Sequence, residues 1–423
     1  MKINPFLSLK IIFFFLLFTQ LSAAKDAPFL GDGEPVKIFL DCGVCDFNYI
    51  KQNFPVLSYV RDVREASVYV MVRRQNTGAG GKIYTFFFEG QEEYLGRMDT
   101  LEVTTAPDAT QQEIRNTVSK TLMAGMMPYI AKTDMLEMLE FKVNDEIEEQ
   151  ITQPVDDQWN AWVFEIGVSG NFNGDDNYQS SRFSGSADAQ RIVQKYKFLL
   201  GLDYDYNRTL YKLEDGDYLN IQRSYRFSHL LAWSLNDHWS IGEAVEGRSS
   251  IYSNLDFSLR MAPAVEYNFY PYAESAQRQF AVLYSLGPRY FDYTNTTVFG
   301  EDEELRVSHQ LRVSFTYNSK WGSVRSNLSA SQYLHDTSLL GLYMRNSAYL
   351  RILKGLNLRM GGGFSLIRNQ LSLVQGEASL EEVLLRQREL ARNFNYFADF
   401  GVSYTFGSFF NNIVNPRFPR GVF

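Results

Sequence analysis

The chain has 423 residues, a formal net charge of -8 at pH 7 and a mean hydropathy of -0.25. The negative charge argues against a nucleic-acid partner, because phosphate binding needs a basic surface. Hydrophobic residues make up 45% of the chain, but after the first 24 residues they are dispersed, so we expect no transmembrane helix further along.

The first residues predict export. Lys2 and Lys10 precede the apolar run 11–18, and Ser22-Ala23-Ala24 offers the small residues that signal peptidase accepts. We therefore predict a signal peptide over 1–24. A membrane anchor is the alternative, but the run is short for a spanning helix. Lys25, rather than a cysteine, follows the cleavage site, so the lipoprotein route has no lipid acceptor.

Residues 25–133 are predicted to form a small periplasmic α/β domain with the order β-α-β-β-α. Strands are expected at 36–40 and 67–72, with a helix from Phe47 between them. A hairpin turn at 76–81 leads to a return strand at 82–88. Helical spacing follows over 110–130, where Thr110 and Glu113 form a capping box. Residues 134–158 are rich in acids and predict a solvated helix or linker.

From Trp159 to residue 407 the pattern alternates with period two, which predicts β-strands with one apolar and one polar face. Twelve such segments occur, many as long as the roughly 9 to 11 residues that a tilted strand needs to cross a bilayer. Short turns at 235–238 and 353–355 alternate with longer loops at 294–303 and 370–391. The pattern is typical of a twelve-stranded antiparallel outer-membrane β-barrel, with residues 408–423 as a periplasmic tail. A soluble β-sandwich is the alternative.

Three features fit this pattern poorly. Glu243 falls on the apolar parity of its strand, and Pro263 and Pro288 interrupt strands, where we expect bulges.

A resemblance supports the two-part architecture. The segment 39–47 (FLDCGVCDF), the barrel start at Trp162-Val163-Phe164 and the ending 406–412 (FGSFFNN) resemble uncharacterised two-part outer-membrane proteins of Gram-negative bacteria. The N-terminal unit is also similar in element order to small periplasmic domains of outer-membrane assembly and secretion machinery. The resemblance implies the fold and the outer-membrane location, and it carries over no catalytic residues.

Cys42 and Cys45 are the only cysteines and lie between a predicted strand and helix. In the oxidising periplasm they are expected to form a disulfide that fastens the strand to the helix. A thioredoxin-like redox pair is the alternative, since the same placement suits that motif. We expect no metal site and no cofactor.

The inward parity of the predicted barrel carries more basic than acidic residues, although the whole chain is acidic. The basic set is Arg182, Lys195, Lys197, Arg226, Arg248, Arg260, Arg289, Arg312, Arg325, Arg345, Arg351 and Arg359, and the acidic set is Glu165, Asp188, Asp203, Asp205, Glu246, Glu266 and Asp399. As lumen-lining residues we single out Arg226, Arg260, Glu266, Arg312, Arg325, Arg345, Arg351, Arg359 and Asp399. A water-filled lumen with this charge would prefer anions, whereas a lumen sealed by its own ion pairs would not conduct.

Three functions follow from these features. The first is a channel or transport-related pore for small anionic solutes. The second is a non-conducting anchor that presents the periplasmic domain to a protein partner. The third is an outer-membrane lipid hydrolase, which would need a Ser-His pair on the lipid face; His229 and His309 have no obvious serine at their level, and His238 and His335 fall in a turn and a loop. Ser379 and Glu382 predict a helix in the longest outer loop, either as a plug in the lumen or as a lid on the rim.

Overall fold

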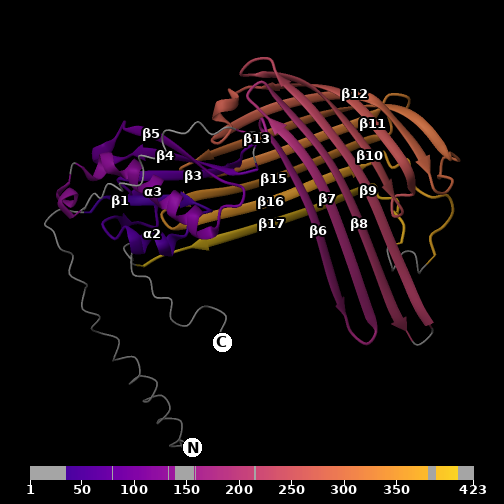
Figure 1. The fold of residues 1–423 in the computed structure, drawn as a ribbon, viewed down its shortest axis with the longest axis horizontal. Helices are drawn as coiled ribbons and strands as arrows, with labels where there is room; N and C mark the ends of the chain where they lie inside the picture. The colour runs from indigo at the N-terminus through magenta and orange to yellow at the C-terminus, as the bar shows by residue number, and fades with distance from the viewer. Residues whose placement is uncertain are drawn as a thin grey trace, which may run out of the picture.

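The computed structural model describes residues 35–78, 80–131, 133–138, 157, 159–213, 216–379 and 387–407. The predicted signal peptide, most of the acidic linker and the tail 408–423 lie outside this description. The described chain folds into two parts, a small N-terminal α/β domain and a large antiparallel sheet (Figure 1). The chain is therefore mainly β, as the alternating sequence predicts.

The N-terminal domain is a five-stranded mixed sheet with the order β2-β1-β3-β4-β5 and two helices. Its elements are β1 (Lys37–Cys42), α2 (Phe47–Asn53), β2 (Ser58–Tyr59), η1 (Val63–Glu65), β3 (Val68–Asn76), β4 (Lys82–Gly90), η2 (Glu92–Tyr94), β5 (Met98–Thr105), α3 (Gln111–Ile130) and η3 (Asp134–Met138). The predicted β-α-β-β-α elements are all present, and two further strands join them. β2 has only two residues, and β5 is a largely exposed edge strand, so neither has a strong hydrophobic pattern.

Two apolar clusters hold this domain together, a large one that includes α3 and a small one around Val63, Tyr69 and Met71. Helix α3 begins at the predicted capping box, in which the Thr110 hydroxyl accepts from the Glu113 backbone N–H and the Glu113 carboxylate accepts from Thr110. The helix packs against β4, and a Cβ at Gly125 would lie 2.0 Å from the Phe88 ring. Glycine is thus required for this close approach.

None of the helices that the structure describes is long and apolar enough to cross a membrane.

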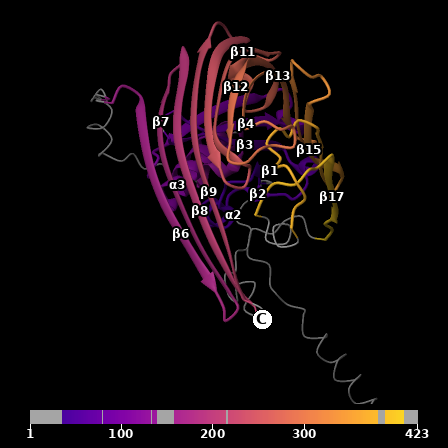
Figure 2. The ribbon, with the colours of Figure 1, turned by 90° about the vertical axis from the view of Figure 1, so that its right-hand side faces the viewer.

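The large sheet has twelve antiparallel strands, each hydrogen-bonded to its neighbours in sequence. They are β6 (Trp162–Gly174), β7 (Tyr178–Ile192), β8 (Tyr196–Leu213), β9 (Gly216–Ser234), β10 (Trp239–Ser250), β11 (Leu255–Asn268), β12 (Arg278–Tyr293), β13 (Glu303–Ser319), β14 (Gly322–Tyr333), β15 (Leu340–Leu353), β16 (Leu356–Ile367) and β17 (Phe394–Tyr404). All twelve predicted segments are confirmed as strands. The sheet is strongly curved, and β6 and β17 form its two margins without pairing to each other in the described residues (Figure 2).

The lengths of the connections alternate less regularly than predicted. The turns after β13 and β15 are short, and the loops after β12 and β16 are long, as expected. The links after β6 and β8, on the side of the long loops, are nevertheless short. Strands β8 and β9 have 18 and 19 residues, so the chain there extends the ladder beyond its neighbours instead of forming a loop.

Pro263 and Pro288 do not create the predicted bulges. Arg260 pairs with Arg289 and Ala264 pairs with Ser285, so the register between β11 and β12 is the same on both sides of the prolines. The ladder between these two pairs is interrupted instead. Both prolines lie in this stretch, and each lacks the N–H that a ladder bond needs. The ladder hydrogen bonds that the two prolines cannot make are missing from the same stretch of the sheet. Neither strand therefore needs the extra residue that defines a bulge.

Candidate functional site

Cross-strand pairing determines which side chains of the large sheet share a face, because paired residues point to the same side and neighbours along a strand alternate. Arg226 pairs with Arg248, and Arg260 pairs with Arg289. Followed from strand to strand, the pairing puts the nine residues predicted to line a lumen on one face, which we call the polar face. Their role as lumen-lining residues stays a prediction.

The opposite face is apolar and unusually exposed. Ile166 on β6 is 83% exposed, and Phe400 on β17 is 85% exposed. Aromatic residues pair with one another along this face, as Tyr204 does with Tyr225 at a ring separation of 4.9 Å. A soluble protein rarely exposes so continuous an apolar surface. This face therefore needs an apolar environment.

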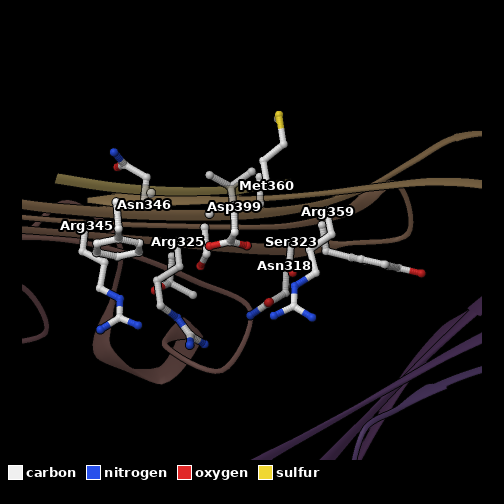
Figure 3. A pocket seen from close by; sticks show the side chains of 16 residues that line it. Asn318, Ser323, Arg325, Arg345, Asn346, Arg359, Met360 and Asp399 are labelled. Atoms are coloured by element: carbon white, nitrogen blue, oxygen red, sulfur yellow. The ribbon is translucent and has the colours of Figure 1, made fainter. Parts of the chain in front are cut away.

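A pocket of about 400 Å³ lies on the polar face over β13 to β17. Figure 3 shows the guanidinium groups of Arg325, Arg345 and Arg359 pointing to one side of the sheet, together with the carboxylate of Asp399. Asn346 points to the other side. Four of the nine predicted residues thus line one pocket, with three positive charges and one negative charge.

Asp399 has room in this pocket because glycine stands opposite it. Asp399 pairs with Gly361, and a Cβ at Gly361 would lie 2.3 Å from its Oδ1 atom. Two residues along, Phe397 occupies the space over Gly363 in the same way and receives the Arg345 guanidinium at 5.5 Å from its ring centroid. Gly361 and Gly363 of β16 thus leave room on the polar face for Asp399 and Phe397 of β17.

The other predicted residues lie elsewhere on the polar face. Arg260 and Arg312 line a second pocket of about 170 Å³ between β10 and β14. Arg226 pairs with Asp203 on β8 and with Arg248 on β10, so these three side chains share the polar face at one level. Glu266 accepts a hydrogen bond of 2.9 Å from the Tyr272 hydroxyl.

Arg351 differs from the rest because it contacts the N-terminal domain. Its guanidinium lies 3.0 Å from the carboxylate of Asp41 and stacks over the ring of Phe39. Arg73 approaches the same carboxylate at 3.2 Å, and the Tyr69 hydroxyl donates to it. Burial raises the pKa of Asp41, but the two guanidinium groups together hold it below its ordinary value. No sequence pattern indicates this contact, since Asp41 lies more than 300 residues from Arg351.

Further contacts join the N-terminal domain to the turns of the sheet around Arg351. Asp62 accepts from the Gly355 backbone N–H at 2.7 Å, and Arg64 donates to the Ile352 carbonyl at 2.9 Å. Lys354 forms an ion pair with Glu65. These contacts hold the domain against the turn between β15 and β16.

The domain also reaches turns far from this one. Lys320, after β13, pairs with Glu89 at 2.8 Å, and Gln75 donates to Ser275, before β12. A Cβ at Gly78, in the β3–β4 hairpin, would lie 2.4 Å from the Cβ of Ile192 at the end of β7. The domain therefore lies across one end of the curved sheet, from β7 to β16.

The long loop after β16 folds over the other end. Leu371 is buried among Phe291, Tyr293 and Tyr333 of the polar face. Val374 forms a β-bridge with Thr297, in the loop after β12. The predicted helix at 376–392 lies partly outside the described residues, including Glu382 of its capping box, and Ser379 is exposed. The described part of the loop thus contacts side chains of the polar face, and the choice between a plug and a lid stays a prediction.

Two further predictions concern the cysteines and the histidines. Cys42 and Cys45 are disulfide-bonded between β1 and α2. His229 lies 3.9 Å from Glu243 on the apolar face, which gives that misplaced acid a partner. His309 contacts Tyr284 and Gln332, and His238 contacts the Asn268 carbonyl. None of these partners is a serine. In the part of the chain that the structure describes, no group of His, Cys, Asp and Glu is placed to hold a metal ion.

No protein-family model matches the chain, and no curated protein matches it. The proposals that follow therefore rest on the polar face, the apolar face and the two covered ends of the sheet.

Proposed function

We propose that the chain is an outer-membrane β-barrel with a periplasmic N-terminal domain, and that its lumen favours small anionic solutes. The observation that carries the proposal is the excess of arginine on the polar face. Fixed positive charge in a narrow lumen raises the local concentration of anions. The whole chain carries a net charge of -8, so the positive charge is a property of this face and not of the overall composition.

The directions of the two marginal strands support closure of the sheet into a barrel. With twelve strands, β6 and β17 run in opposite directions, as antiparallel pairing between them requires. An unpaired edge next to an apolar face would promote aggregation. Closure satisfies the edge hydrogen bonds, and a bilayer satisfies the apolar face. The protein should then fractionate with the outer membrane and migrate differently on a gel before and after heating.

The reversal potential in a salt gradient tests the lumen. Purified full-length protein in a planar bilayer should show anion preference, and replacing Arg312 and Arg325 with Gln should weaken it. Arg208 and Arg223 lie on the opposite face by register. Their replacement with Gln removes the same charge and should leave the preference unchanged. Cation preference, or an equal effect of both double variants, would contradict the proposal.

A second candidate function is an outer-membrane anchor that presents the N-terminal domain to a periplasmic protein. The edge strand β5 favours it, because within the described residues it pairs only with β4, and its Met98 is 75% exposed. An extended peptide could add to such an edge. Absence of conductance in both the intact protein and a variant lacking residues 376–391 would make this candidate the better account.

A further inference from the structure

A row of charged residues crosses four strands of the polar face at one level. Glu246 on β10 pairs with Arg260 on β11, Arg260 pairs with Arg289 on β12, and Arg289 pairs with Arg306 on β13. Like charges placed directly opposite across strands destabilise a sheet. Arginine cannot relieve the repulsion by losing its proton. Three adjacent guanidinium groups therefore need compensating negative charge.

Only one of these arginines is compensated by close carboxylates. Arg306 forms ion pairs with Glu304 and Glu301. Arg260 donates to the Ser285 hydroxyl at 3.3 Å, and within the described residues neither Arg260 nor Arg289 has an acid within ion-pair distance. The Nε atom of Arg289 is buried and has no hydrogen-bond partner, while its guanidinium stacks over Phe291. A buried cationic donor is costly unless an acceptor reaches it, so this row of arginines favours an anion with acceptor oxygens beside it.

The pocket at this row has the size and the donors for a small oxyanion. Its volume is about 170 Å³, below the roughly 300 Å³ at which sites for drug-sized ligands begin. Arg312 and Gln310 line it beside Arg260 and Arg289, and Asn369 lines it from the loop that carries Leu371. A guanidinium group can donate two parallel N–H hydrogen bonds to two oxygens of one phosphate.

We propose that Arg260, Arg289 and Arg312 form a binding site for a phosphate group inside the lumen. The inference rests on the proposed function in requiring that solutes reach the polar face. It goes further in naming the chemical class of the solute and the place where it binds. Glu246 at one end of the row confines the ligand to the arginine side, because a carboxylate repels it.

Calorimetric titration of the detergent-solubilised full-length protein with inorganic phosphate tests the site, in chloride buffer of constant ionic strength. The wild type should bind phosphate, and Arg289→Gln should weaken binding by about tenfold or more, as expected for the loss of charge-assisted hydrogen bonds. Arg345→Gln is the matched control: it removes the same charge from the polar face in the other pocket and should change binding little. A short-chain phosphatidic acid, added in parallel, distinguishes a soluble phosphate from a lipid headgroup, and tighter binding of the lipid would overturn the assignment to a soluble solute.

The result is separable from that of the conductance test. Anion preference in the bilayer without phosphate binding in solution would overturn this inference and leave the proposed pore intact. Phosphate binding that Arg289→Gln and Arg345→Gln weaken equally would also overturn it, since only general charge attraction would then be at work. Binding lost in Arg289→Gln alone would support the site even if the protein did not conduct.

Discussion

The contact between Asp41 and Arg351 should dominate the docking of the N-terminal domain onto the sheet. Their side chains are only 19% and 11% exposed, and the carboxylate contacts two guanidinium groups and one hydroxyl. Removing one partner of a buried, hydrogen-bonded ion pair costs about 2–5 kcal/mol. Asp41→Asn keeps the shape of the side chain and one acceptor oxygen, so we expect the lower part of this range, about 2–3 kcal/mol.

That energy corresponds to a docking equilibrium weaker by about 30- to 150-fold, since each 1.4 kcal/mol is a factor of ten. A disulfide between Gln75→Cys and Ser275→Cys reports docking at a distant turn, because the wild-type side chains are in hydrogen-bond contact at 3.3 Å. In an oxidative time course the Asp41→Asn background should form this cross-link in a much smaller fraction of molecules.

Glu89→Gln is the matched control. It removes one acidic charge from the same interface, but the pair with Lys320 is exposed and worth about 0–1 kcal/mol, at most about a fivefold effect. If Asp41→Asn lowered cross-linking no more than Glu89→Gln, the buried ion pair would not hold the domain in place.

Three other outcomes follow from the structure. Docking should weaken in acid. The pKa of Asp41 is lowered in the docked state, so its contribution to docking is present above the ordinary value of 3.8 and is lost as the pH falls through the lowered value. Energy transfer between dyes attached at positions 75 and 275 measures this from pH 7 to 3, because disulfide formation needs the thiolate and is too slow in acid to report docking. Gly287→Ala would place a Cβ 1.8 Å from the Met261 carbonyl oxygen and should destabilise the large sheet by about 1–3 kcal/mol in urea unfolding. Gly185→Ala has no neighbour nearer than 3.9 Å and should leave the stability unchanged, so equal stability of the two variants would contradict the close approach. Leu371→Ala should remove about 2–5 kcal/mol of packing energy and release the loop after β16, so that a protease cleaves this loop faster. Leu334 is exposed, and Leu334→Ala should leave the rate of cleavage unchanged.

The sequence predicted the strands well and the contacts between distant segments poorly. Alternation alone identified all twelve strands, because a sheet with one apolar face repeats that pattern at every crossing. The same alternation put Arg312 and Arg325 on one face. The face of a strand residue follows from its place in the alternation alone, without knowledge of which residue pairs with it on the next strand. The alternation did not reveal strand β5, and the bulges predicted at Pro263 and Pro288 were wrong. Edge exposure weakens the apolar pattern of β5, and the effect of a proline depends on which residue faces it across the ladder.

The features with most bearing on function depend on strand register and on contacts between distant segments, and the alternation of apolar and polar residues predicts neither of them. Whether Arg260 faces Arg289 or another residue of β12 depends on strand register, since a shift of two residues would keep its face but change its neighbour. Asp41 and Arg351 meet only because the N-terminal domain packs against the turns. Both ends of the sheet are thus covered by segments whose placement depends on a few contacts. These contacts escape a prediction from alternation, because each joins residues that are far apart in the chain.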